Sequence, residues 1–227
     1  MAETAVGVVV GAGPGLGNAL VNRFAECGMA VAAVSRRGIA PELRQRGGVV
    51  RGYACDATVT DQVKSMFARV NSELGPPELV VFNVGTWDRA GILEISDDLF
   101  VQAWRTGCFG GFVVGRAAAE AMLPQGRGTI MFTGATGSLR GGAGFAAFAV
   151  PKFGLRALAQ SMARELGSKG IHVAHVIVDG MIASPGGSPQ QGFMKPDEIA
   201  EAYYQLHRQK RSAWTHELDI RPSVEKF

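Results

Sequence analysis

The chain has few cysteines, and none of them are paired at a metal-binding spacing. Cys27, Cys55 and Cys108 are odd in number and form no CxxC motif, so they support neither a zinc site nor a disulfide framework. Isolated cysteines of this kind are typical small apolar residues of a reducing compartment. We therefore expect no bound metal and a cytoplasmic protein.

Strong net charge and long apolar runs are also missing. The 227 residues include 23 basic and 20 acidic side chains, and the formal net charge of +3 is dispersed along the chain, which argues against nucleic acid as the main partner. No uninterrupted apolar run approaches the roughly 18 to 20 residues that span a bilayer. The first residues lack the basic region and cleavage-like site of a secretory signal. We expect a soluble protein without a membrane partner.

What the chain does contain is an alternation of short apolar runs with segments of helical spacing. Continuous apolar runs indicate strands that are covered on both faces, as in a parallel sheet. No internal repeat or low-complexity linker divides the chain, so the sequence predicts one domain over residues 1–227. We expect an α/β fold of three layers, a doubly wound parallel sheet between helices. The expected strands are residues 5–10, 29–34, 49–54, 79–82, 129–132, 171–178 and 217–220.

Capping residues and glycines define the expected helices. Thr58 or Thr60 could cap a helix that includes residue 70. Ser96 is followed by two carboxylates that suit the positive end of a helix. The helix after Ser96 runs toward residue 123 and contains four glycines, which cost about 1 kcal/mol each relative to alanine. Close packing must compensate that cost. The glycines are Gly107, Gly110, Gly111 and Gly115.

Two more helices are expected in the second half of the chain. One covers residues 145–170, where Pro151 is acceptable only in or near the first turn. The other covers residues 196–209. Between them, residues 181–196 are rich in Gly, Pro and Ser and predict a mobile loop.

The strongest functional motif is a glycine loop after the first strand. Glycines at a strand-to-helix turn let backbone amides approach a diphosphate, and the helix N-terminus favours its negative charge. The spacing is Gly-x3-Gly-x-Gly, which differs from GxGxxG, and an ordinary glycine turn is the alternative. The residues concerned are Gly11, Gly13, Gly15, Leu16 and Gly17.

The end of the second strand indicates which nucleotide binds. An acid about 20 residues beyond the glycine loop would hold the ribose of NAD, but this chain has Ser35, Arg36 and Arg37 there. Two guanidinium groups can pair with a 2′-phosphate, which favours NADP(H) over NAD(H). A solvated basic turn is the alternative.

With these motifs in hand, the chain resembles the short-chain dehydrogenase/reductase family over nearly its whole length. The family's Asn-Asn-Ala-Gly signature is partly kept as Phe82-Asn83-Val84-Gly85. Other matching segments are Gly11–Gly17, Asp56, Leu93–Asp97 and Ala163–Leu166. The resemblance implies cofactor contacts, which include adenine for Asp56 and the carboxamide for Ser184. The positions are Asp56, Ala57, Asn83, Val84, Gly85, Thr133, Lys152, Asp179, Gly180, Ile182 and Ser184.

The resemblance also implies a reaction centre, and most of it is missing. Lys152 matches the family's lysine, but the catalytic tyrosine position is Phe148 and the serine position aligns with Ala135. The family's asparagine falls near Gly107. A different loop register could bring Ser138 to the serine's place. Lys152 can still bind the nicotinamide ribose, whereas Phe148 has no proton to give.

Other acids could replace the tyrosine. Asp179 stands where the family has a proline and could orient the carboxamide or carry a proton, with a structural turn as the alternative. His172 and His175 lie in a strand and are expected to be structural. Tyr203 and Tyr204 follow the mobile loop, and surface or interface packing is favoured for both.

Two functions remain open from the sequence. The first is an NADP(H)-dependent oxidoreductase with an altered centre, acting on a small carbonyl or an activated alkene in a partly apolar pocket near Trp87 and Met181–Lys195. The second is a non-catalytic NADP(H)-binding sensor or assembly subunit. In both, the resemblance implies a homodimer or homotetramer that associates through the glycine-rich helix and the helix after Phe148.

Overall fold

Seven parallel strands form one sheet in the computed structural model, which describes residues 4–38, 48–184 and 192–225. The strand order is β3-β2-β1-β4-β5-β6-β7. The predicted doubly wound parallel sheet is confirmed. The sequence also predicts a short helical piece around Glu42–Arg46, initiated by the preceding proline, which lies outside the described residues. The strands are β1 Val6–Val10, β2 Ala30–Ser35, β3 Val50–Ala54, β4 Pro77–Phe82, β5 Gly128–Ala135, β6 Ile171–Val178 and β7 Glu217–Ile220.

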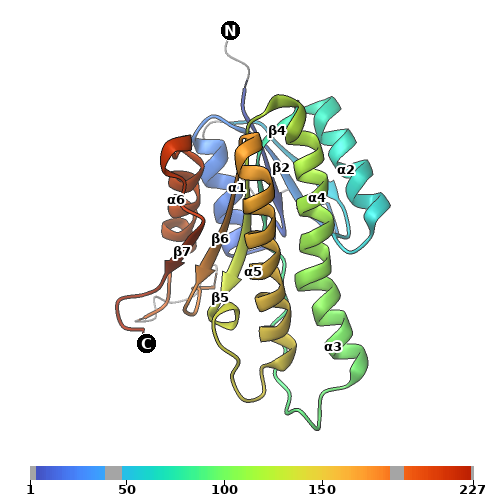
Figure 1. Ribbon diagram of the computed structural model, residues 1–227, viewed down its shortest axis with the longest axis vertical. Helices are drawn as coiled ribbons and strands as arrows, with labels where there is room; N and C mark the ends of the chain where they lie inside the picture. The colour runs from blue at the N-terminus through green and yellow to red at the C-terminus, as the bar shows by residue number, and fades with distance from the viewer. Residues whose placement is uncertain (1–3, 39–47, 185–191, 226–227) are drawn as a thin grey trace.

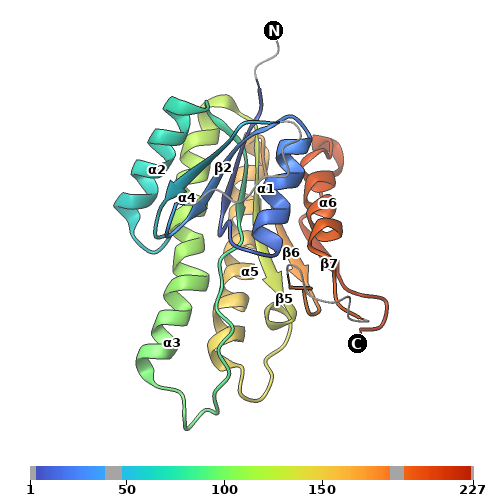
Figure 2. The same cartoon turned by 180° about the vertical axis from the view of Figure 1, so that it is seen from behind.

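Helices cover both faces of the sheet, as Figures 1 and 2 show from opposite sides. One layer consists of α1 (Leu16–Glu26) and α6 (Pro196–His207). The other consists of α2 (Thr60–Glu73), α4 (Gly110–Met122) and α5 (Ala146–Leu166). The remaining helix, α3 (Asp97–Trp104), leads into α4 through a π-helical turn, Arg105–Phe109. Short 3₁₀ turns follow α4, β5 and α5 and precede β7, at Leu123–Gln125, Thr136–Ser138, Gly167–Lys169 and Arg211–Ala213.

Each face of the sheet carries its own hydrophobic core because strand side chains alternate. In β1, Val8 and Val10 pack with the residues of α2, α4 and α5, whereas Val9 packs with α1 and α6. The sheet reverses its winding between β1 and β4, which are neighbours although β2 and β3 lie on the other side of β1. At such a point the loops after the strands diverge and leave a crevice at the carboxyl ends.

The helix beginnings agree with the sequence in one case and differ in another. Ser96 caps α3, since its Oγ accepts a hydrogen bond from the Leu99 amide at 3.2 Å. The cap of α2 is Val59, without a side-chain hydrogen bond, so the prediction of a Thr58 or Thr60 cap is wrong. Thr58 is engaged elsewhere, because its amide and hydroxyl both donate to the Asp56 carboxylate, at 2.9 and 2.8 Å.

Close packing accounts for the glycines between residues 107 and 115. A Cβ atom on Gly107 would lie 3.0 Å from Pro151, and one on Gly111 would lie 2.4 Å from Leu155, both in α5. A Cβ atom on Gly115 would lie 2.8 Å from the Phe132 ring in β5. These glycines let α4 and the turn before it approach α5 and the sheet within the same chain.

Pro151 lies just beyond the first turn of its helix, close to the place that the sequence requires. It is the sixth residue of α5 and therefore belongs to the second turn, where the ring removes one helical hydrogen bond. The buried ring packs against Gly107, and this contact offsets part of the loss.

Within the described residues, no helix is long and apolar enough to cross a membrane.

Replacing Gly115 tests whether packing or helix propensity decides stability. We expect Gly115→Ala to lower the free energy of unfolding by about 1–3 kcal/mol, because the added methyl group overpacks against Phe132. Propensity alone would raise it by about 1 kcal/mol. The control is Gly167→Ala, where a Cβ atom meets nothing within 4 Å. Urea unfolding that shows both variants equally stable would contradict this account.

Candidate functional site

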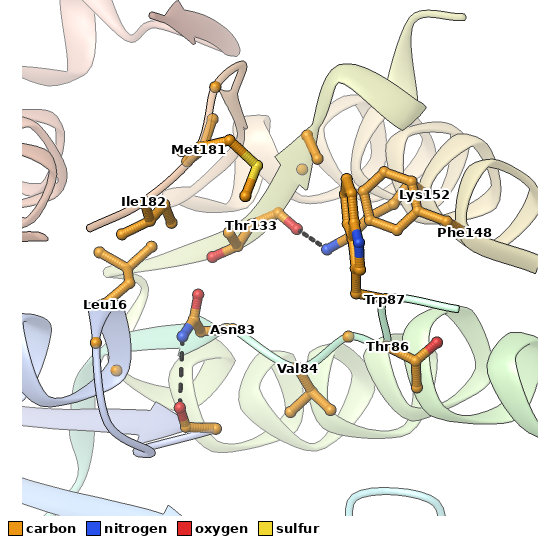
Figure 3. Close-up of a pocket in the computed structure, with 18 of the residues that line it drawn as sticks. Leu16, Asn83, Val84, Thr86, Trp87, Thr133, Phe148, Lys152, Met181 and Ile182 are labelled. Carbon is orange, nitrogen blue, oxygen red and sulfur yellow. Dashed lines mark hydrogen bonds between the residues drawn. The ribbon is translucent and has the colours of Figure 1, made fainter. Parts of the chain in front are cut away.

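A cavity of about 590 Å³ opens at the carboxyl ends of β1, β4, β5 and β6 (Figure 3). The glycine loop, the loop after β4 and the segment after β6 line it together with one side of α5. Its position is the crevice expected from the strand order. The lining residues include Gly11, Gly15, Leu16, Gly17, Asn83, Val84, Gly85, Thr86, Trp87, Thr133, Ala135, Phe148, Lys152, Gly180, Met181, Ile182 and Ser184.

A second cavity of about 400 Å³ continues the first across β1 toward β2 and β3. The two share Gly11 and the segment Asn83–Thr86, so they adjoin along the sheet edge, and we refer to them together as the groove. The far end is lined by Gly13, Ser35, Arg36, Asp56, Ala57 and Thr58. The structure therefore brings together almost all the cofactor residues expected from the sequence.

The glycine loop has the shape that a close-approaching ligand requires. Gly11 has φ of +94°, and a Cβ atom there would lie 2.6 Å from the Asn83 carbonyl oxygen. A Cβ atom on Gly17 would lie 2.2 Å from the Gly11 carbonyl oxygen. Gly15 begins α1 and offers no side-chain cap, which leaves the start of the helix available to an anion.

Two residues with polar side chains after β4 line the groove. The Asn83 amide nitrogen donates to the Gly11 carbonyl oxygen at 3.4 Å and ties the end of β4 to the glycine loop (Figure 3). Thr86 lines both parts of the groove, and its buried hydroxyl has no hydrogen-bond partner within the described ranges. Because the Thr86 hydroxyl is buried, Asn83 is the one of these two side chains that points into the cavity (Figure 3).

Lys152 places a cation at the end of the groove that lies beside α5, which we call the inner end. Only 7% of the residue is exposed, and its Nζ donates to the Thr133 carbonyl oxygen at 2.7 Å (Figure 3). Gly85 makes room for it, since a Cβ atom there would lie 3.3 Å from Nζ. Burial lowers the pKa of Lys152 to about 8, because an apolar surrounding disfavours the charged form.

Phe148 lies beside Lys152 and gives this end of the groove an apolar wall. Its ring is 8% exposed and packs edge-on against Trp87, with 4.7 Å between ring centroids. Ala135 lines the same region. Neither Phe148 nor Ala135 can donate a proton from its side chain.

Comparison with known proteins agrees with this geometry. The profile of the family described as short chain dehydrogenase matches residues 5–190. The chain belongs to the short-chain dehydrogenase family. The family binds a nicotinamide cofactor, and the groove fits one, since it combines a glycine loop at a helix start without a side-chain cap and the Lys152 cation.

Relatives of this short-chain dehydrogenase include reductases. It is 31% identical to the 3-oxoacyl-[acyl-carrier-protein] reductase MabA of Mycobacterium avium over 77% of this chain and 66% of that protein. It therefore spans just under two thirds of that relative. A putative ketoacyl reductase of Streptomyces coelicolor is 27% identical, over 81% of this chain and 72% of that protein.

Solved structures show the same fold. A short-chain dehydrogenase from Rhodopseudomonas palustris is 44% identical and covers 98% of this chain and 100% of its own, with a TM-score of 0.86. A metagenomic short-chain oxidoreductase in complex with NADP is 25% identical, with a TM-score of 0.84 and coverage of 97% and 98%.

The structure does not bring Ser138 into the cavity of this dehydrogenase. The residue is fully buried, and its Oγ accepts from the Ala135 amide at 3.2 Å and lies 3.3 Å from His175 Nε2. His175 Nδ1 in turn lies 3.4 Å from Glu217. Burial lowers the pKa of His175 to about 4, so His175 is neutral near pH 7. Ser138 and His175 brace the turn behind β5.

Asp179 is also turned away from the cavity. Its neighbours Val178 and Gly180 line the cavity, but the Asp179 carboxylate is buried, accepts from the Thr136 hydroxyl and lies 3.5 Å from Arg221. Asp179 therefore ties the end of β6 to the turn after β5. Its position agrees with the structural alternative that the sequence left open.

At the other end of the groove, the two arginines differ. Both side chains are exposed, but Arg36 is part of the groove lining and Arg37 is not. Ser35 Oγ accepts from the Gly38 amide at 3.1 Å and shapes the turn. The pKa of Asp56 is lowered chiefly by the Thr58 amide, with the charge of Arg36 among the further causes. Asp56 therefore remains a carboxylate at neutral pH.

The sequence did not predict one contact near the site, which joins Tyr203 to Thr133. Tyr203 is fully buried, and its hydroxyl lies 2.8 Å from Thr133 Oγ1 beneath the cavity. The prediction of surface or interface packing is wrong for Tyr203, because α6 turns this side chain into the core. Burial raises the pKa of Tyr203. Helical spacing with Ile199 and Leu206 was the signal that could have revealed it.

The segment after β6 forms the remaining wall. Met181, Ile182 and Ser184 line the cavity. Ile182 pairs with Met194 in an isolated bridge, in which the Ala183 amide donates to the Met194 carbonyl oxygen at 2.9 Å. Residues 185–191 of the expected loop lie outside the described part of the chain.

A titration of the protein without nucleotide tests the buried state of Lys152. In NMR spectra of protein with ¹³C-labelled lysine, we expect the Lys152 Cε resonance, assigned through its loss in Lys152→Met, to titrate near pH 8. The unfolded chain then binds more protons than the folded one between about pH 8 and the ordinary value of 10.5, so this group makes stability rise with pH in that window. A midpoint near the ordinary lysine value would contradict the burial.

Proposed function

We propose that this protein is an NADP(H)-dependent oxidoreductase with an altered catalytic centre, whose substrate is a small carbonyl compound or an activated alkene. The observation that carries the proposal is a pair of adjoining cavities with Arg36 at one end, the glycine loop in the middle and Lys152 at the other end. The names of the relatives support a reductase, and the name of one structural neighbour includes NADP.

Arg36 accounts for the proposed preference for NADP(H) over NAD(H). The glycine loop accounts for the position of the nucleotide. An adenosine 2′-phosphate is a dianion, and Arg36 offers a guanidinium group within the groove where an NAD-binding protein has an acid. The start of α1 then receives the diphosphate. Asp56 and Ala57 line the space for adenine.

Lys152 has a double role in the proposed reaction. The bound reduced nicotinamide supplies a hydride, and Lys152 Nζ orients the neighbouring ribose by hydrogen bonding. Among the described side chains that line the inner cavity, Lys152 is the titratable one. Its pKa of about 8 lets Nζ hold a proton near neutral pH and release it to a substrate oxygen or carbon, directly or through water.

The second candidate is a protein that binds NADP(H) without turnover, as a sensor or assembly subunit. Phe148 and Ala135 favour it, because two side chains of the family's reaction centre are replaced by apolar ones. Losing a general acid costs about 10²- to 10⁴-fold in rate. Binding in the groove would survive that loss.

We also propose that the protein forms a homodimer or homotetramer. Phe112 of α4 and Val150 and Phe153 of α5 are exposed, and they lie on the two helices for which the family resemblance implies a subunit contact. Apolar side chains gathered on neighbouring helices favour burial against a second copy.

The two arginines provide a matched test of nucleotide preference. We expect calorimetry to show NADPH binding at least about tenfold more tightly than NADH, and Arg36→Gln to remove most of that preference because the 2′-phosphate loses its partner. Arg37→Gln removes the same charge outside the groove lining and should have a smaller effect. Equal affinity for both nucleotides in the wild type would overturn the NADP(H) preference.

Restoring the missing hydroxyl tests the altered centre. We expect Phe148→Tyr to raise the rate of carbonyl reduction by at least about tenfold, because it adds a general acid beside Lys152, and Ala135→Ser to raise it further in that background. The measurement is NADPH oxidation over a panel of small ketones and conjugated enones. A wild type that is already fast and loses activity in Phe148→Tyr would contradict the proposed centre. A wild type silent on the whole panel but tight for NADPH favours the non-catalytic protein.

A further inference from the structure

A smaller cavity of about 250 Å³ adjoins the inner end of the cofactor groove. Trp87 and Phe148 line both cavities, so the wall that replaces the catalytic tyrosine also bounds this second space. We call it the aromatic pocket. Its lining residues are Trp87, Thr136, Gly137, Arg140, Gly141, Gly142, Phe145, Phe148 and Ala149.

Three aromatic rings make up the floor of the aromatic pocket. The ring centroids of Trp87 and Phe145 are 5.4 Å apart, and those of Phe145 and Phe148 are 6.4 Å apart. Trp87 is nevertheless 62% exposed. A large ring that neighbours hold in place but that still faces solvent is well suited to stack on a flat apolar ligand.

The edge of the aromatic pocket is positively charged. Arg140 is exposed and is part of the lining, and the Arg89 guanidinium lies over the Phe145 ring, 5.4 Å from its centroid. The lining contains no acidic residue among those that the structure describes. Two guanidinium groups beside a cluster of tilted and edge-on rings favour a ligand that combines an aryl ring with an anionic group.

Glycines keep the aromatic pocket open. A Cβ atom on Gly141 would meet no atom within 4 Å, and Gly141 does not have a positive φ, so its backbone does not require glycine. The absent side chain leaves space for a ligand. An apolar cavity of roughly 150 Å³ suffices for benzene, so the volume here accommodates an aromatic ring together with a substituent.

We propose that the aromatic pocket binds the aryl ring of an aromatic carboxylate substrate, with the carboxylate at Arg140 and the reacting carbonyl or alkene group extending past Trp87 into the cofactor groove. This inference names the substrate class of the site and rests on the proposed function for the reaction itself. The ring and the carboxylate can bind without turnover, so the aromatic pocket and the proposed oxidoreductase function can be tested separately.

Calorimetry with 2-naphthoate tests the inference directly, with and without NADP⁺. We expect 2-naphthoate to bind at least about tenfold more tightly than cyclohexanecarboxylate, which lacks the aromatic ring, and than 2-naphthalenemethanol, which lacks the charge. Trp87→Ala should weaken 2-naphthoate at least about tenfold. Arg140→Gln should bring 2-naphthoate and the alcohol to similar affinity.

Two further variants keep the test independent of folding. Gly141→Leu fills the pocket without backbone strain and should reduce 2-naphthoate binding while leaving NADP⁺ affinity and the melting temperature close to the wild type. Arg127→Gln removes an exposed charge that pairs with Glu78 at 3.1 Å and should change nothing. Absent 2-naphthoate binding, or binding unaffected by Trp87→Ala, Arg140→Gln and Gly141→Leu, would overturn the aromatic pocket. Binding of 2-naphthoate without any binding of NADP⁺ would instead support the pocket and overturn the proposed function.

Discussion

The burial of the Lys152 ammonium against the Thr133 carbonyl oxygen is the constraint around which the site is arranged. Burying a charge is unfavourable unless polar groups compensate it, and here the 2.7 Å hydrogen bond joins α5 to the carboxyl end of β5. Gly85 leaves room for Nζ on the side of β4. The cation is thereby fixed at the inner end of the groove, where its position does not depend on a neighbouring tyrosine.

The glycine contacts between α4 and α5 support that arrangement. Pro151, which directly precedes Lys152, packs against Gly107. One turn further along α5, Leu155 packs against Gly111. A larger side chain at either glycine would push α5 away from the sheet and move the lysine with it. Gly107, near which the resemblance places the family's asparagine, thus serves packing.

We propose that Phe148 stands at the family's tyrosine position, where it changes both the chemistry and the shape of the site. The ring cannot supply a proton, but it joins Trp87 and Phe145 in an aromatic cluster between two cavities. In the proposed function, Phe148 thus stands in place of the family's general acid and adds an apolar surface that borders both cavities. Both proposed functions are consistent with the absence of this proton donor. In the proposed aromatic pocket, the rings of Trp87, Phe145 and Phe148 bind the substrate's aryl ring.

The sequence predicted the sheet and the groove because apolar runs and glycine spacing are local signals. It could not predict that Ser138 and Asp179 face away from the cavity, since this depends on how the 3₁₀ turn after β5 packs against β6. Nor did it reveal Tyr203 below Thr133 or the unpartnered Thr86 hydroxyl. These features arise from contacts between elements far apart in the chain.

A crystal structure of the protein with NADP⁺ bound tests the central claim most directly. The account predicts the diphosphate at the start of α1 over Gly15–Gly17, the 2′-phosphate at Arg36, and the nicotinamide ribose within hydrogen-bond distance of Lys152 Nζ with its ring beside Phe148. A nucleotide bound elsewhere, or one whose nicotinamide end points away from Lys152, would contradict it.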